Sequence, residues 1–262
     1  MGYSSNILWH QTTKEGFNGI MKACQFKASY SLETIRWKLN KESFAIPMIS
    51  FCNLPLSDMD EYLGKYGSYT IGMRKSWNYY AKLSPVWYRQ PQAPTLHILM
   101  DIFKDKKKDL LNREKCFFSK YFDNNHAKLF WSNLAYTKNY EGPLKRRNKK
   151  LYRFFDEAEF RFVPALQTLK ETKTQPLLTE IEYREYKKKN KSSVIMVDEL
   201  GLPFSLEDIE YILVKDKGNI PHVNDILQKY FPMYSTEKGR KPYIITYDEI
   251  KMNIIGIEHH KS

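Results

Sequence analysis

The sequence predicts a folded protein that mixes helices and strands, either as one large α/β or α+β domain or as two small domains. Its 262 residues are enough for a substantial core, and 42% hydrophobic with 15% aromatic residues argue against a disordered chain. Apolar runs of strand length alternate with segments whose apolar residues recur at helical spacing. No internal repeat is present, so a repeat architecture is not expected.

The net charge and the spacing of the cysteines indicate which partners and which kinds of site to expect. The 42 lysine and arginine residues against 30 acidic residues give a net charge of +12, which favours a polyanionic partner such as nucleic acid. Cys24, Cys52 and Cys116 show no CxxC spacing, so neither a disulfide framework nor a zinc site is expected. The start of the chain lacks a secretory pattern, and no run of about 18 apolar residues would cross a membrane. A soluble cytoplasmic protein is predicted.

A strand followed by a helix is predicted at the start of the chain. Asn6–Thr13 reads as a strand with a polar end, and the helix should run from about Lys14 to Cys24 with Thr13 as its N-cap. His10 and Thr12 share one face of this strand end. A lone histidine is more often a surface or core residue, but strand ends commonly face pockets, so this pair is a candidate for a site.

The next elements are bounded by glycine, proline and asparagine. Residues 25–45 are predicted to be a connecting region with a short helix near Leu32–Leu39, and Met48–Cys52 to be a buried strand. A helix is expected over Ser57–Lys65, and the alternating pattern of Ser68–Met73 predicts a strand.

Aromatic and basic residues interleave in Lys75–Lys82, KSWNYYAK. Such a segment can stack nucleic acid bases and attract phosphate. An amphipathic helix that packs Trp77 and Tyr80 inward explains the pattern equally well.

The second half of the chain repeats the mixture of helix and strand. Broken stripes of apolar residues predict that 95–136 is helical. The remaining predictions are strands at Pro85–Tyr88, Val194–Val197 and Tyr243–Tyr247 and a helix at Pro221–Phe231.

A basic segment precedes the most informative stretch of the chain. Asn139–Lys150 contains Gly142-Pro143 and is therefore predicted to be a loop. Its basic residues are candidates for contact with nucleic acid or another phosphate, although a solvated loop is the default interpretation. They are Lys145, Arg146, Arg147, Lys149 and Lys150.

Two carboxylates lie close together in Leu151–Pro164, LYRFFDEAEFRFVP. On an extended strand Glu157 and Glu159 would project to the same face, where like charges raise each other's proton affinity. A pair of this kind indicates a functional site. A solvated edge strand, in which the glutamates meet Arg153 and Arg161, is an equally good interpretation, because structural ion pairs perturb carboxylates too.

Several common catalytic motifs are absent from the sequence. There is no glycine-rich phosphate loop of the GxGxxG or GxxxxGK type, no HExxH, and no cluster of cysteine and histidine. No metal site is therefore expected.

Four segments in order resemble the AbiGi family, an abortive phage-infection family described as antitoxin. They are LWHQT near the start, IPMISFCNLPL at Ile46–Leu56, YGSYTIG at Tyr66–Gly72 and FDEAEFRFVP at Phe155–Pro164. The resemblance covers roughly residues 7–165. The chain departs from the family pattern at Asn53, where aspartate is usual, at Thr70, where glycine is usual, and at Phe160, where tryptophan is usual.

The same layout more distantly resembles the ADP-ribosyltransferase fold. That resemblance implies an α+β fold with a mixed, split β-sheet core and flanking helices, in a single domain over 1–262 with a helical insertion around 95–140. It also implies NAD as substrate and no metal. Glu159 would then be catalytic, binding the ribose 2′-hydroxyl and stabilising positive charge as the nicotinamide bond breaks, and Glu157 would orient it or deprotonate the acceptor. The implied NAD contacts are His10, Thr12 and Ser50, with Tyr69 stacking on nicotinamide.

Two functions of different class follow. In the first, a phage-defence protein transfers ADP-ribose from NAD to RNA, DNA or a protein. In the second, a non-catalytic antitoxin-like partner binds a cognate toxin or nucleic acid. The retained His10/Thr12 and Glu157/Glu159 pairs favour the first function. The antitoxin description favours the second, as does the lack of an obvious arginine clamp for the NAD pyrophosphate, for which Arg36 and Arg74 are the candidates.

Overall fold

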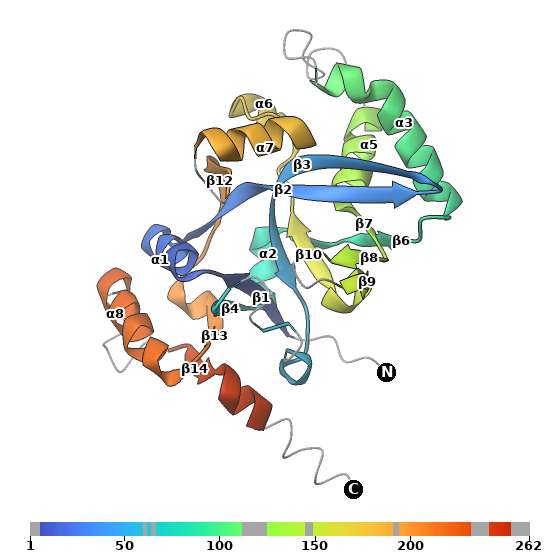
Figure 1. Ribbon diagram of the computed structural model, residues 1–262. Coiled ribbons are helices and arrows are strands. Elements are labelled where there is room, and N and C mark those ends of the chain that lie inside the picture. The colour runs from blue at the N-terminus through green and yellow to red at the C-terminus, as the bar shows by residue number, and fades with distance from the viewer. Residues whose placement is uncertain are drawn as a thin grey trace, which may run out of the picture.

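A long curved hairpin forms the middle of the molecule in the computed structural model, which describes residues 6–59, 62–63, 67–111, 125–144, 149–190, 194–231 and 241–252 (Figure 1). Its strands are β2 (Gln25–Trp37) and β3 (Asn40–Cys52), paired from Ser29 with Met48 to Trp37 with Asn40. The expected connecting region with a helix near Leu32–Leu39 is therefore wrong.

Strand β3 belongs to both halves of a split sheet. Its first part pairs with β2, its last four residues pair with β10, and Cys52 also meets Trp9 of β1. The sheet order is β12-β2-β3-β1-β4-β13-β14, with β10 and β11 on β3, and the parallel pair β13–β14 makes it mixed. The predicted α+β class with a mixed, split sheet is confirmed. The other strands are β1 (Ile7–Thr12), β4 (Tyr69–Arg74), β5 (Ser84–Pro85), β6 (Trp87–Arg89), β7 (Thr137–Asn139), β8 (Glu141–Leu144), β9 (Lys149–Arg153), β10 (Glu159–Phe162), β11 (Leu178–Thr179), β12 (Met196–Pro203), β13 (Ile209–Val214) and β14 (Tyr243–Thr246).

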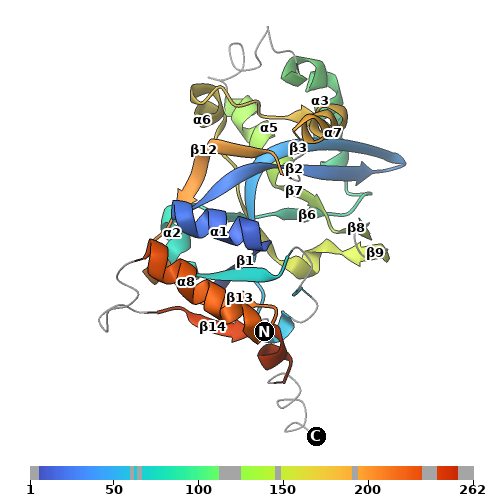
Figure 2. The same cartoon turned by 60° about the vertical axis from the view of Figure 1, so that its left-hand side comes forward.

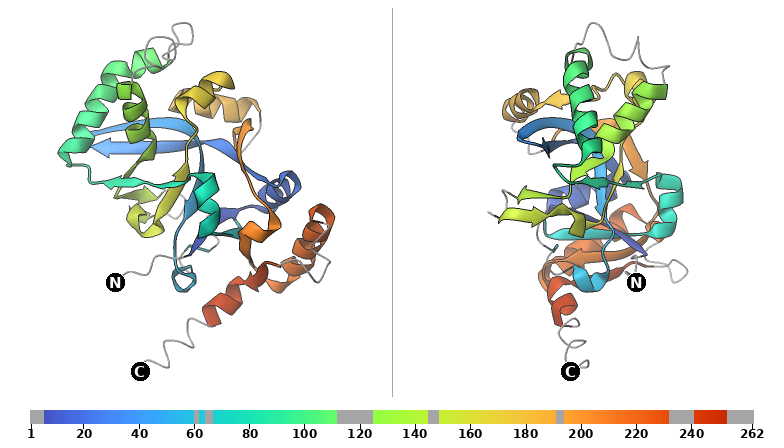
Figure 3. Two further views of the ribbon diagram at one scale, coloured as in Figure 1. Left: turned by 180° about the vertical axis from the view of Figure 1, so that it is seen from behind. Right: turned by 90° about the vertical axis from the view of Figure 1, so that its right-hand side faces the viewer.

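The helices gather at two ends of the sheet. Helices α3, α5, α6 and α7 surround the β2–β3 hairpin, whereas α1 and α8 pack against each other beside β1 and β13 (Figures 2 and 3). None of the described helices is both long and apolar enough to span a membrane. Their bounds are α1 (Lys14–Ala23), α2 (Asn78–Ala81), α3 (Pro94–Leu111), α5 (Asn125–Tyr136), α6 (Leu166–Glu171), α7 (Glu180–Lys189) and α8 (Ile220–Tyr230), and a further helix covers 247–252.

The boundaries of β1 and α1 agree with the predicted ones to within one residue. The side chain of Thr13 accepts a hydrogen bond from the amide of Gly16 at 3.2 Å, as an N-cap residue does. Phe17 and Met21 are fully buried, one helical turn apart, and therefore fix the face of α1 that packs on the sheet. The helix ends at Cys24, which adopts the left-handed conformation.

Two predicted helices differ from the structure. Within Lys75–Lys82, a 3₁₀ turn and the single turn of α2 bury Trp77 as expected, but Tyr80 is 83% exposed instead of packed inward. In place of a helix over Ser57–Lys65 the structure has a 3₁₀ turn at Leu56–Asp58. Residues 60–61 and 64–66 lie outside the described residues.

A buried carboxylate cluster as the candidate active site

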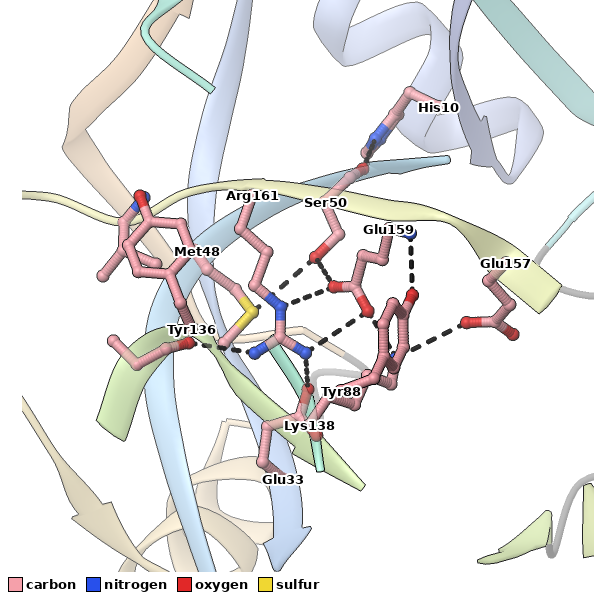
Figure 4. A network of polar contacts seen from close by, with 12 residues as sticks. His10, Glu33, Met48, Ser50, Tyr88, Tyr136, Lys138, Glu157, Glu159 and Arg161 are labelled. Atoms are coloured by element: carbon pink, nitrogen blue, oxygen red, sulfur yellow. Dashed lines mark hydrogen bonds and ion pairs between the residues drawn. The ribbon is translucent and has the colours of Figure 1, made fainter. Parts of the chain in front are cut away.

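Strand β10 places Glu159 and Arg161 beside Ser50. In the antiparallel register of β10 on β3, Glu159 is opposite Cys52 and Arg161 is opposite Ser50. Alternate residues of a strand share a face, so these side chains project together. The Glu159 carboxylate accepts hydrogen bonds from Ser50 Oγ at 2.8 Å and from Arg161 Nε at 2.6 Å (Figure 4).

A lysine from outside the sheet completes the cluster. Lys138 lies on β7, directly after helix α5, and its ammonium group donates to Glu159 and also lies 3.4 Å from the Glu157 carboxylate. The guanidinium group of Arg161 additionally donates to Glu33 at 2.5 Å. Among the described residues, the cluster thus contains the three carboxylates of Glu33, Glu157 and Glu159 against the two cations Lys138 and Arg161, so its formal charge is negative.

Burial and ion pairing determine the ionisation of this cluster. Burial by itself would raise the pKa of Glu159, but the charges of Arg161 and Lys138 outweigh it and hold that pKa far below its ordinary value. Burial would likewise lower the pKa of Lys138, but the surrounding carboxylates, Glu159 foremost, raise it well above the usual range. At neutral pH Glu159 is therefore an anion that can accept hydrogen bonds and stabilise positive charge, and it is unsuited to donating a proton.

Glu157 reaches the cluster by a different route from the predicted one. Strand β9 ends at Arg153, a 3₁₀ turn covers Phe154–Glu157, and Ala158 has φ 43° in the left-handed region before β10 begins. The expectation that both glutamates lie on one strand face is therefore wrong. They nevertheless meet at Lys138, and both are buried, with 4% and 6% of their surface exposed.

The edge-strand interpretation is also only partly correct. Arg161 does pair with Glu159, but both side chains are buried instead of solvated. Arg153 pairs at the surface with Asp156, at 2.6 Å, and not with the two glutamates.

A cavity of about 370 Å³ adjoins the cluster at Glu157. Its lining comprises Leu54, Asp58, Tyr62, Tyr152, Asp156 and Glu157. Burial raises the pKa of the Tyr152 hydroxyl, and so do the charge of Glu157 and a hydrogen bond with it. Glu157 is therefore the carboxylate of the cluster that borders open space.

His10 contacts the cluster only through the backbone of Ser50. Its Nδ1 lies 2.9 Å from the Ser50 carbonyl oxygen, which can only accept, so Nδ1 carries the proton. Burial lowers the pKa of His10, against the opposing effect of that carbonyl. The ring is therefore neutral at pH 7 with an unprotonated Nε2, and it packs between Phe26 and Phe51 at centroid distances of 5.1 and 5.3 Å.

Thr12 and Tyr69 lie on the other face of the sheet from Glu159. They are opposite each other in the pairing of β1 with β4, and alternation along β1 places His10 on their side. The Tyr69 ring stacks on Phe17 of α1 at 4.9 Å, and its hydroxyl donates to Asn219 at 2.9 Å. Figure 4 shows the same separation, with His10 on one side of β3 and the carboxylates on the other.

The predicted site residues thus fall into two groups. The structure brings Ser50, Glu157 and Glu159 together, and it places His10, Thr12 and Tyr69 on the opposite face. Of the predicted basic contacts, Lys145, Arg146 and Arg147 lie outside the described residues, as do the side chains of Lys149 and Lys150 on β9. Among the residues described, no group of three or more potential ligands could hold a metal ion.

Sequence reasoning missed Lys138, Glu33 and Tyr88. Tyr88 of β6 accepts a hydrogen bond from the Glu159 amide at 2.8 Å and so fixes the start of β10. No local pattern indicates these residues, because each reaches Glu159 or Arg161 from a distant strand. Arg161 could be recognised as a partner of Glu159, because it is two residues further along the same strand and so shares its face.

Comparison with known proteins identifies the family. A family model described as "Putative abortive phage resistance protein AbiGi, antitoxin" matches residues 18–215. The chain belongs to the AbiGi family. The predicted resemblance is therefore confirmed, and the match includes β3, β7 and β10, which build the carboxylate cluster of this AbiGi protein.

Two further comparisons complete this result. No curated protein matches the AbiGi chain. Among solved structures, Thermus sp. 2.9 DarT in complex with NAD+ aligns at 12% identity and a TM-score of 0.35, over 94% of this chain and 97% of that one.

Proposed function

We propose that this AbiGi protein acts in phage defence by transferring ADP-ribose from NAD to a macromolecular acceptor, with the Glu157–Glu159 cluster as its active site. The observation that carries the proposal is the excess of negative charge in a buried cluster that borders a cavity. Such a site favours a reaction that develops positive charge, because a low-dielectric environment strengthens the attraction.

Cleavage of the nicotinamide–ribose bond is a reaction of this kind. The bonding electrons leave with nicotinamide, and the ribose carbon passes through an oxocarbenium-like state before the acceptor attacks it. Glu159 would stabilise that charge and accept a hydrogen bond from the ribose 2′-hydroxyl. Glu157, at the cavity, would orient the acceptor or take its proton.

The fixed donors around Glu159 fit this role. Ser50 and Arg161 hold the carboxylate in one orientation, and the depressed pKa keeps it ionised. An electrostatic stabiliser needs a preorganised charge more than it needs a titrating one.

The other predicted NAD contacts require a separate test. His10, Thr12 and Tyr69 project to the α1 face, so the proposal rests on Ser50, Glu157 and Glu159. The unprotonated Nε2 of His10 is suited to accept a hydrogen bond from a ribose hydroxyl. If it does so, His10→Ala will weaken NAD binding. An unchanged affinity would assign His10 to the core.

A second function, that of a non-catalytic antitoxin-like partner, is supported by a different observation. Every hydrogen-bonding oxygen of Glu159 is engaged within the protein, and the Arg74 candidate for a pyrophosphate clamp pairs with Glu210 at 2.8 Å instead. A protein that only binds a toxin or nucleic acid would tolerate such a closed cluster, as a structural ion-pair network.

Transfer of label from NAD distinguishes the two functions. We would incubate the wild-type protein with labelled NAD and RNA, DNA or lysate protein as acceptor, alongside Glu159→Gln and Glu157→Gln. The proposed transferase labels one acceptor class, and loss of the stabilising charge in Glu159→Gln should slow transfer by about 10²–10³-fold.

The control is Glu199→Gln, which makes the same change at an exposed position of β12 and should leave transfer unaltered. Circular dichroism shows which variants are folded. If Glu159→Gln does not fold, Glu157→Gln still tests the cluster. Absence of both label transfer and calorimetric NAD binding in the wild type would contradict the transferase and leave partner binding.

A further inference from the structure

Among the described residues, three side chains bind the Glu159 carboxylate, and the large sheet fixes two of them. Ser50 and Arg161 lie on β3 and β10, and the pairing of these strands sets their positions. The third, Lys138, lies on β7, which pairs with β6 in a separate two-stranded sheet. The next residue, Asn139, holds the backbone of β7 to that of β2 through two hydrogen bonds of 2.9 Å. Any movement of Lys138 relative to Glu159 is therefore a movement of its side chain.

The Arg161 side chain is held from several directions. It is fully buried, and besides Glu159 its guanidinium group contacts the Ala135 carbonyl oxygen at 3.0 Å and Glu33 at 2.5 Å. Displacing it from Glu159 would leave a buried cation with broken hydrogen bonds, which is costly. Arg161 is therefore a permanent partner of Glu159.

The Lys138 side chain has more freedom. It is 13% exposed, and its ammonium group contacts Glu157 as well as Glu159. The ammonium nitrogen also lies 5.2 Å from the centre of the Phe154 ring, within the range of a cation–π contact. Lysine carries a compact charge on a long flexible chain. The ammonium group can therefore move away from Glu159 and keep its contacts with Glu157 and Phe154.

The two oxygens of Glu159 have different donors (Figure 4). Oε1 accepts hydrogen bonds from Ser50 Oγ at 2.8 Å and from Arg161 Nε at 2.6 Å. Oε2 accepts from Lys138 and, at 3.3 Å, from a second nitrogen of Arg161. Withdrawal of Lys138 would open Oε2 to a new donor and leave Oε1 engaged. Against the burial that raises the pKa of Glu159, Arg161 acts more strongly than Lys138, so the carboxylate would stay ionised.

We propose, on the basis of the transferase function above, that Lys138 is an internal cation that occupies the place of the substrate at Glu159 and withdraws from Oε2 when NAD binds. A carboxylate whose oxygens are all engaged gains in this way an acceptor for the ribose 2′-hydroxyl. Glu157, whose carboxylate lies 3.4 Å from the ammonium nitrogen, receives the withdrawn charge beside the cavity. The closed state lowers the apparent affinity for NAD, because binding must first break the contact between Lys138 and Glu159.

Removal of the ammonium group tests this role. Lys138→Met keeps the length of the side chain without its charge, so NAD no longer displaces a cation. NAD affinity of the full chain, measured by calorimetry, should rise about 10–100-fold, the effect of one hydrogen bond to a charged group. In the transfer assay the KM for NAD should fall with kcat little changed. Lys128→Met, the same change at an exposed position of α5, should alter neither.

The outcomes separate the role of Lys138 from the proposed function. Tighter NAD binding by Lys138→Met supports the role, even if transfer by the wild type is too slow to detect. Equal or weaker binding by Lys138→Met, with transfer by the wild type, would assign Lys138 to the structure and leave the transferase in place. Absence of NAD binding by both proteins would overturn the transferase and the role of Lys138 together. If circular dichroism shows Lys138→Met to be unfolded, Lys138→Gln, which is uncharged but still a donor, should show the same rise in affinity.

Discussion

At Glu159, burial and ion pairing act on the same carboxylate in opposite directions. Burial favours the neutral acid, but Arg161 and Lys138 lie close enough that their attraction prevails and the pKa falls far below its ordinary value. The same contacts that keep Glu159 charged are the ones that hold it in place. The contacts of Glu159 with Arg161 and Lys138 therefore contribute both to the stability of the fold and to the proposed electrostatic role of Glu159.

The stability of the protein should depend on the charge of Glu159. Because its folded-state pKa is depressed, its contribution is fully present above about pH 4.3, the unfolded value, and is lost as the pH falls toward the folded value. Glu159→Gln leaves Arg161 and Lys138 without this partner and should cost about 3–5 kcal/mol at pH 7. Urea unfolding measures this, with Glu199→Gln as the control. Equal stability of the two variants at pH 7 would contradict it.

Two of the described histidines, His10 and His97, should be opposite tautomers. His10 uses Nδ1 toward the Ser50 carbonyl at 2.9 Å, whereas His97 uses Nε2 toward the Pro91 carbonyl at 2.9 Å. Long-range ¹H–¹⁵N NMR spectra should assign the proton to Nδ1 in His10 and to Nε2 in His97. Because burial lowers the pKa of His10, its ring should still be neutral at pH 6.5. The same tautomer in both rings would rule out this arrangement.

The helices and strands that could be predicted from the sequence are those marked by a capping residue or by regularly spaced apolar residues. The β1–α1 unit follows from Thr13 as cap and from the spacing of Phe17 and Met21. The β2–β3 hairpin was missed because it turns at Lys38, a non-glycine residue with φ 50°, which no turn signal marks. The turn that carries Glu157 was also missed, because it ends at Ala158, another non-glycine residue in the left-handed region, with φ 43°.

The candidate site was only half predictable for a related reason. Glu157 and Glu159 could be singled out from their spacing, and Ser50 from its place in a family motif. Lys138 and Glu33 could not, because they reach the cluster from strands whose pairing depends on the whole fold. Conversely, His10 and Thr12 satisfy the motif, yet the face on which they lie depends on the register of β1 with β4.

The contact between α1 and β1 can be tested with two glycines of one helix. A Cβ on Gly19 would meet nothing within 4 Å, so Gly19→Ala should stabilise the protein by about 0.5–1 kcal/mol through helix propensity. A Cβ on Gly16 would lie 2.1 Å from Thr12 Oγ1, so Gly16→Ala should destabilise it. Thermal unfolding measures both changes. Adding Thr12→Ala should recover the loss in Gly16→Ala, and failure to recover would place the clash elsewhere.

In the molecule as a whole, the segment after the family match is part of the same core. The match ends at Lys215, before α8 and β14, yet Val223 and Leu227 of α8 are fully buried in the cluster that contains Phe17. Strand β14 also extends the sheet by pairing in parallel with β13. These contacts place α8 and β14 in the same core as the matched segment, while the single domain over 1–262 stays a prediction.

Removal of this segment should therefore unfold the protein instead of releasing a separate domain. Without α8, the burial of Val223 and Leu227 is lost, which removes about 1.5–3 kcal/mol of folding free energy for each side chain. The total of about 3–6 kcal/mol is comparable to the 5–15 kcal/mol by which domains are stable. The hydrogen bond from Tyr69 to Asn219 is lost as well. A chain ending at Lys215 should show no cooperative thermal transition and rapid proteolysis, whereas the full chain should unfold cooperatively and resist the protease. Native near-ultraviolet circular dichroism from the chain ending at Lys215 would instead establish that residues 1–215 fold independently, with α8 and β14 as an addition to a complete domain.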